Sequence, residues 1–267
     1  EAVVSVGGIY GSPDSYWSFR LGQFHSLVRV GWGGLDRPTG ISTPMPLSRA
    51  LVAGNPYTIN QDQVGVEGAY VFKNHRFFGQ VLNGADLGTA STTDHADQNR
   101  QKDWLVGYEF MWGDLASGLS LFYYDGTQDD LTSAVAPDVL KFKRYGVTAS
   151  QVWKHGFEIQ GGFVQGKDDY DIPIAPGVED RTGQGYWVEV MQHWEAAHDL
   201  SVFGRYETLD PDTDVEENVR SAAIVGFVWP VASWHVRWGL ELRSIEQETA
   251  VDTFSDKQAA AELMLNF

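Results

Sequence analysis

The chain has 267 residues, a net charge of −17 and no cysteine, and 13% of its residues are aromatic. An acidic chain repels phosphate backbones, so we exclude nucleic acid as a partner. No stretch approaches the roughly 18 consecutive apolar residues of a membrane-spanning helix. The sequence does not open with the basic and apolar segment of a signal peptide, so we expect that residues before Glu1 are cleaved or absent.

Alternation of apolar and polar residues with a period of two runs through nearly the whole chain and predicts strands rather than helices. It is clearest in 233–245, where tryptophan, valine and leucine side chains alternate with Arg237, Glu241 and Arg243. The pattern predicts about thirteen strands. In chain order they are 2–10, 16–24, 64–72, 76–84, 104–112, 118–126, 141–153, 157–165, 185–194, 200–208, 218–229, 233–245 and 257–267.

The lengths of the strands and of their connections favour a membrane barrel over a soluble β-sandwich, which also alternates apolar and polar residues. Segments of about 9–13 residues are long enough to cross a bilayer at a tilt, whereas soluble strands average about 5–6. Short and long connections alternate, as do the periplasmic turns and outer loops of outer-membrane barrels. The short connections are 73–74, 113–117, 154–156, 195–199 and 230–232, and the long ones are 26–60, 86–101, 126–140, 166–184, 209–217 and 246–256.

Aromatic residues on the apolar faces gather beside the short turns, as an interfacial girdle requires. They are Phe72, Phe77, Trp112, Trp153, Phe157, Trp194, Trp229 and Trp234. The last strand ends in Phe267, which resembles the recognition end of proteins inserted by the barrel-assembly machinery. We therefore predict an all-β fold in which 1–267 form a single domain, a transmembrane antiparallel β-barrel of about 12–14 strands in the outer membrane.

The strand count depends on the first strand. If the C-terminal strand runs toward the periplasm, strand 2–10 also runs inward, whereas a closed antiparallel barrel needs a first strand that runs outward. Either 2–10 lies outside the ring, which gives about 12 strands, or a strand before Glu1 is missing, which gives about 14 or more.

Two stretches resemble a known family. Ser18–Gln23 reads Ser-Phe-Arg-Leu-Gly-Gln and is followed by Phe24 and a long loop, and 205–215 reads Arg-Tyr-Glu-Thr-Leu-Asp-Pro-Asp-Thr-Asp-Val. With Leu82-Asn83-Gly84, they resemble the phosphate-selective porin O and P superfamily, in which a strand ending in Gly-Gln-Phe leads into a long loop folded into the pore. The resemblance implies a general or anion-preferring porin, a homotrimer whose constriction is formed by loop 26–60. The lysine-rich anion cluster of a phosphate-specific member is not recognisable in this sequence.

Two groups of residues are predicted to line the pore. Loop 26–60 carries Arg29, Arg37 and Arg49 against the single acid Asp36, and three guanidiniums at a narrowing would attract anions. The alternative is that they pair with acids on neighbouring strands or face solvent. The strand faces opposite the apolar ones supply basic and acidic residues in similar number, which form either a water-filled channel or a plugged barrel. These are Arg20, Arg76, Arg144, Arg205, Arg237, Arg243, Glu67, Glu109, Glu189, Glu207 and Glu241.

The outer loops hold much of the excess acid, including an Asp-x-Asp-x-Asp run at 210–214. The glycine and the distal glutamate of a calcium loop are not in place, so we predict no metal site but a solvated face that collects divalent cations bridging lipopolysaccharide. Neither Gly-x-Ser-x-Gly nor His-Glu-x-x-His occurs, and we predict that the protein is not an enzyme and needs no cofactor.

The function predicted from the sequence is a porin for passive or weakly selective diffusion of small ions and solutes. Its partners would be outer-membrane lipid and lipopolysaccharide. The alternative is a secretion or export conduit, or a structural barrel around a partner protein, which would involve a periplasmic partner. The sequence before Glu1 would discriminate, because a coiled-coil or repeat domain would favour export and a further strand would favour a porin.

Overall fold

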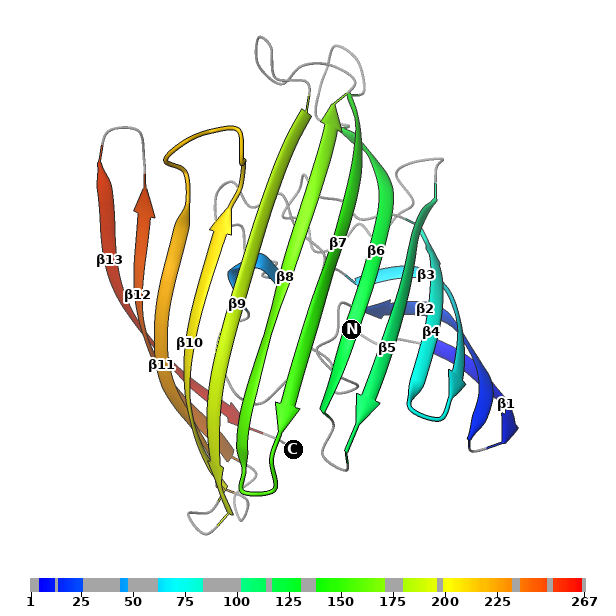
Figure 1. Ribbon diagram of the computed structural model, residues 1–267, viewed down its shortest axis with the longest axis horizontal. Helices are drawn as coiled ribbons and strands as arrows, with labels where there is room; N and C mark the ends of the chain where they lie inside the picture. The colour runs from blue at the N-terminus through cyan, green and yellow to red at the C-terminus, as the bar shows by residue number, and fades with distance from the viewer. Residues whose placement is uncertain are drawn as a thin grey trace.

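Thirteen strands form one antiparallel sheet in which each strand pairs with the next along the chain (Figure 1). The structure, a computed structural model, describes residues 5–12, 14–25, 44–47, 62–83, 102–113, 117–130, 138–170, 180–195, 199–231, 236–248 and 252–265. The strands are β1 (Ser5–Ser12), β2 (Ser15–His25), β3 (Asp62–Phe72), β4 (His75–Leu82), β5 (Asp103–Trp112), β6 (Ser117–Asp130), β7 (Asp138–Val152), β8 (Phe157–Tyr170), β9 (Asp180–Trp194), β10 (Leu200–Asp210), β11 (Arg220–Val231), β12 (Val236–Glu248) and β13 (Thr253–Leu265). A short 3-10 helix, η1 (Met45–Leu47), lies between β2 and β3 in the sequence.

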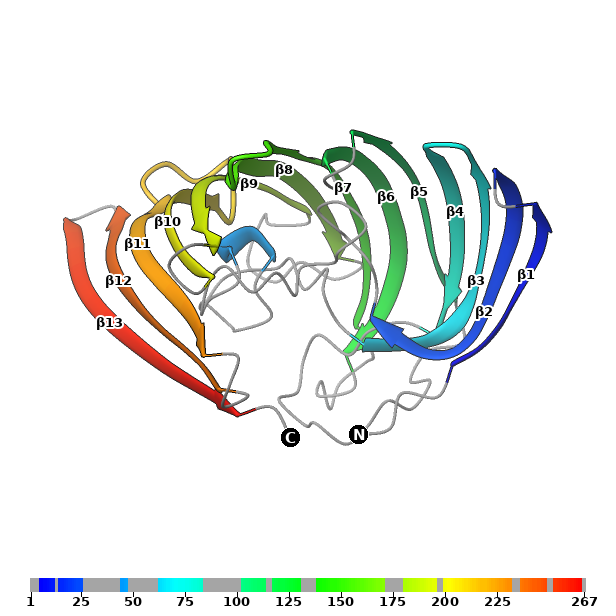
Figure 2. The ribbon, with the colours of Figure 1, turned by 90° about the horizontal axis from the view of Figure 1, so that it is seen from below.

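The all-β antiparallel architecture predicted from the alternation is confirmed. The sheet is bent into a trough with β1 and β13 at its rims and η1 on the concave side (Figure 2). β1 pairs with β2 from Ser5 opposite Gly22 to Ser12 opposite Ser15, so the described residues 5–10 of the predicted strand 2–10 lie in the sheet rather than outside it. The sheet is not closed, because β1 and β13 are not paired with each other.

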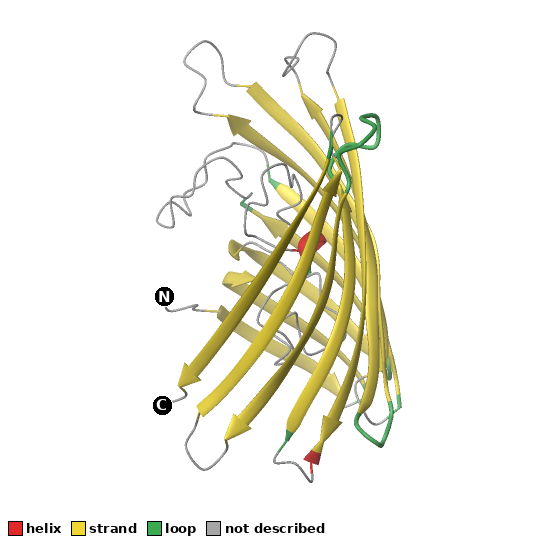
Figure 3. Cartoon of the chain, turned by 90° about the vertical axis from the view of Figure 1, so that its left-hand side faces the viewer, coloured by secondary structure: helices red, strands yellow, loops and turns green. Residues whose placement is uncertain are grey.

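The strands are longer at the long-loop end than the apolar pattern predicts. β7 and β9 each contain 15 residues, and parts of the predicted loops 126–140, 166–184 and 246–256 are strand. The apolar pattern stops where polar residues begin, but the ladder of backbone hydrogen bonds continues. In this extension, Nζ of Lys167 lies 3.1 Å from the carboxylate of Asp169 and 2.8 Å from that of Asp180. The strand ends that the short connections join lie at the opposite end of the inclined strands (Figure 3).

Buried aromatic rings on the concave face lie over glycines that stand directly opposite them on the neighbouring strand. A Cβ atom at Gly107 would lie 2.2 Å from the Phe78 ring, and one at Gly162 would lie 2.3 Å from the Trp187 ring. The aromatic–glycine pairs are Phe78 with Gly107, Phe122 with Gly146, Phe142 with Gly126, Trp187 with Gly162, and Phe203 with Gly226. Each ring thus occupies space that a side chain on the adjacent strand would fill. The rings can therefore lie flat against the sheet and remain buried.

Candidate pore-lining face

The two faces of the sheet have the opposite polarity to those of a soluble sandwich. Along β9, Trp187 and Glu189 are buried, with exposed fractions of 1% and 2%, whereas Val188 and Val190 between and beyond them are 49% and 40% exposed. The same alternation recurs from β3 to β12, where buried carboxylates and arginines share the concave face with the aromatic–glycine pairs. Large apolar side chains are therefore exposed on the convex face and charges are held within the trough.

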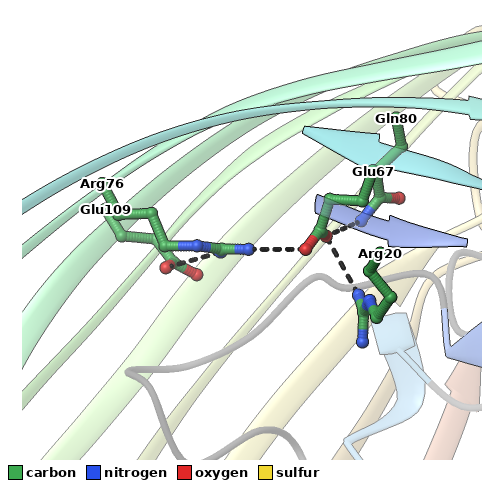
Figure 4. A network of polar contacts seen from close by, with 5 residues as sticks. All are labelled: Arg20, Glu67, Arg76, Gln80 and Glu109. Carbon is green, nitrogen blue, oxygen red and sulfur yellow. Dashed lines mark hydrogen bonds and ion pairs between the residues drawn. The ribbon is translucent and has the colours of Figure 1, made fainter. Parts of the chain in front are cut away.

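A first cluster of charges crosses four adjacent strands, β2 to β5 (Figure 4). Arg20 Nη2 donates to Glu67 Oε2 at 2.9 Å, and Gln80 Nε2 donates to the same oxygen at 2.7 Å. Arg76 joins two carboxylates, with Nη2 lying 3.0 Å from Glu67 Oε1 and Nη1 lying 2.9 Å from Glu109 Oε2. Arg20 stands opposite Glu67 and Arg76 stands opposite Glu109 in the register of the sheet, so strand pairing itself brings opposite charges together.

A second cluster lies on β9, β10 and β12. Arg205 contacts two acids, since its Nη1 lies 3.2 Å from Glu189 Oε2 and its Nε lies 3.1 Å from Glu207 Oε2. On β12, Arg243 Nη2 donates to Glu241 Oε1 at 2.9 Å, so these two residues pair within one strand. These arginines are neutralised by carboxylates on the same face.

Arg144 forms a buried ion pair with Asp168 of β8. The apolar pattern predicts that Asp168 lies in the outer loop 166–184, so this partner was not predicted. Continuing the period-two pattern of β8 beyond residue 165 would have placed Val164, Gly166 and Asp168 on the buried face. Gln80 was also missed, because a neutral amide carries no charge signal, although it lies on the same face as Arg76 and Glu67.

Some of the predicted lining residues lie outside the described part of the structure. Arg29, Arg37 and Arg49 of loop 26–60 are not described, and neither is the side chain of Arg237. The remaining predicted lining residues are buried or half-buried on the concave face and take part in ion pairs. Their role in lining a pore stays a prediction.

The aromatic residues beside the short turns lie on the convex face. Phe72, Phe77, Trp153 and Trp194 are exposed, and the Trp153 and Phe157 rings lie 5.3 Å apart. Trp234 lies outside the described residues. Exposed and half-buried aromatic rings thus lie beside the short turns on the convex face. Their role as an interfacial girdle stays a prediction.

Comparison with known proteins gives no match: no protein-family model, no curated protein and no solved structure resembles the chain at a significant level. The likeness to the phosphate-selective porin O and P superfamily therefore stays a prediction from short motifs. No helix in the described ranges is long and apolar enough to cross a membrane. Within the same ranges, no three histidine or acidic side chains come together to hold a metal ion.

Proposed function

We propose that the protein is an outer-membrane β-barrel that works as a channel for passive or weakly selective diffusion of small ions and solutes. The proposal rests on the polarity of the two faces, which is the reverse of that in a soluble protein. Apolar side chains are exposed on the convex face, and ion pairs are buried on the concave face. Such an arrangement is stable when lipid covers the convex face and water or protein fills the concave one. Its surroundings would be outer-membrane lipid and lipopolysaccharide, and the homotrimer that the resemblance implies belongs to the same proposal.

The height of the apolar band supports a bilayer environment. On β9 the exposed band extends from Tyr186 to Trp194, which are about eight residues, or about 26 Å, apart along the strand. At a tilt of about 35–45° this is about 20 Å across the membrane, close to the apolar band of about 25 Å in outer-membrane barrels. On β7 and β8 charged residues begin just beyond the band, where Lys143 stands opposite Lys167.

The inner face supports weak rather than strong ion selectivity. Each described arginine of the lining set contacts a carboxylate, and such pairs present local dipoles rather than a continuous positive stripe. Buried carboxylates outnumber these arginines on the concave face, with Glu158 and Asp103 adding to the paired acids. We therefore expect this wall to favour cations, and an anionic preference would have to come from Arg29, Arg37 and Arg49.

The test is to insert the purified protein into a planar lipid bilayer and measure conductance and reversal potential under a salt gradient. We expect a steady conductance with a small cationic bias, and the same protein after heat denaturation is the control. An anionic bias that disappears in the triple variant R29A/R37A/R49A would show that loop 26–60 sets selectivity. A folded, inserted protein without conductance would contradict the channel and favour the alternative of a barrel that encloses a partner protein.

A further inference from the structure

The segment Met45–Leu47 is attached to the inner wall at a well-defined place. The backbone N–H of Met45 donates to Glu207 Oε2 at 3.0 Å, and both residues are buried. Met45 also belongs to the buried apolar cluster that contains Trp187 and Leu209. A buried backbone N–H requires an acceptor, and here a carboxylate from β10 supplies it.

Gly185 of β9 forms the floor of this attachment. A Cβ atom at position 185 would lie 2.6 Å from Pro46 Cγ and 2.9 Å from Pro46 Cβ, which are distances that real Cβ atoms do not show. Gly185 stands opposite Leu209 in the register of β9 and β10. The glycine thus provides the space in which Pro46 lies against the sheet.

The charge of Glu207 is balanced from the other side. Oε2 of Glu207, which accepts the Met45 N–H, also lies 3.1 Å from Arg205 Nε. Glu207 has an exposed fraction of 0%. Oε2 therefore contacts a main-chain amide and a guanidinium, and the buried carboxylate does not contact solute in the pore.

We propose that Gly185, Glu207 and Leu209 form a seat that holds residues 44–47 on the inner wall and so fixes how far the pore narrows at this level. Glu207 is then a positioning residue that acts through Met45. The effect on the pore rests on the proposed function, whereas the seat itself does not.

Cross-linking tests the seat without any channel activity. The natural chain has no cysteine, so the double variant P46C/G185C contains a single pair of thiols. A small shift from 2.9 Å brings the two Cβ atoms to the separation of about 3.8 Å found in disulfides. We expect mild oxidant to close a disulfide in the folded protein, read as loss of titratable thiol and altered gel mobility. The control is P46C/G204C, because Gly204 lies on the opposite face of β10, and it should remain reduced.

Hydrogen exchange of the unaltered protein provides a second measurement that no misfolded variant can obscure. The Met45 amide should be protected in the natural protein, remain protected in E207Q, whose amide oxygen still accepts, and lose protection in E207L. An unprotected Met45 amide in the natural protein, or a P46C/G185C variant that folds but does not cross-link, would overturn the seat.

Single-channel recording connects the seat to the pore. We expect E207L to show a larger conductance and more switching between levels, and E207Q to behave as the natural protein does. Equal conductance in both variants would overturn the narrowing role. If the natural protein conducts no current, the proposed function fails, and cross-linking and exchange still decide whether the seat exists.

Discussion

Glu67 shows how tightly single side chains are bound into the inner face. It accepts hydrogen bonds from Arg20, Arg76 and Gln80, which come from two neighbouring strands. Removing one partner of a buried ion pair leaves the other charge without compensation, and this costs more than the pair itself contributes. Substituting Glu67 therefore gives the most direct test of whether the first cluster stabilises the fold.

Glu67→Ala should lower the free energy of unfolding by about 3 kcal/mol, because two half-buried guanidiniums lose a buried carboxylate. Glu67→Gln should cost less, since its amide oxygen can still accept a hydrogen bond. Urea unfolding in lipid vesicles gives the measurement, and Glu246→Ala, at an exposed position on β12, is the control. Equal unfolding midpoints for E67A and E246A would show that the cluster does not stabilise the fold.

At this scale the sequence predicted the face of a residue but not its partner. A period of two puts Arg20 and Glu67 on the same side of the sheet, yet pairing them requires the register, which alternation leaves undetermined. The Arg144–Asp168 pair was missed for a related reason, because the strand continues past its last apolar residue. The arginines of loop 26–60 have no periodic pattern that would place them.

The aromatic–glycine pairs can be tested within one strand pair, β8 and β9. Gly162→Ala places a Cβ atom 2.3 Å from the Trp187 ring, and the ring must move into a packed interior, at a cost of about 1–3 kcal/mol. Gly204→Ala, on the convex face of the next strand, β10, is the control, because the nearest atom to its Cβ is 3.9 Å away. Unfolding free energies of the two variants in the same vesicles should differ by that amount, and equal values would show that the ring has room to move.

The convex face of β9 separates a membrane strand from a soluble one. Val190 lies midway along the exposed band, and Val190→Arg should destabilise the protein by about 2–4 kcal/mol at the bilayer midplane. Gln184→Arg, on the same face but beyond Tyr186, should cost about 0–1 kcal/mol. In a soluble protein both substitutions would place an arginine in water, so equal unfolding free energies would contradict the membrane assignment.

If the whole molecule lies in a bilayer, water reaches the concave face and lipid covers the convex face. Because the sequence has no cysteine, single cysteine substitutions can measure which face water reaches. On β8, Ile159 is exposed on the convex face, and Gln160 beside it is half-buried and donates to Glu189 on the concave face. After insertion into liposomes, a water-soluble maleimide should label Q160C, and only a lipid-soluble one should label I159C. Labelling of I159C by the water-soluble reagent would mean that water covers the convex face.

The order of the sheet was predictable at this scale because sequential hairpins need only local information. Alternation predicted the strand sequence, and the short turns indicated which neighbours pair. Closure was not predictable from the same signal, because it depends on contacts between the first and last strands. The position of η1 could not be predicted from local alternation either, because Gly185 and Glu207, which hold it, lie about 140 residues or more away in the sequence.

The aromatic–glycine pairs also work as alignment marks. A short turn fixes the stagger of its two strands through its own geometry, whereas a long loop leaves them free to slide past each other. All of the pairs occur where long connections join the strands, in β4–β5, β6–β7, β8–β9 and β10–β11. A slip of two residues would move the Phe78 ring from Gly107 onto Leu105 or Glu109. The sheet thus carries two kinds of alignment, one in its turns and one in its glycines, and together they specify one stagger across eight consecutive strands.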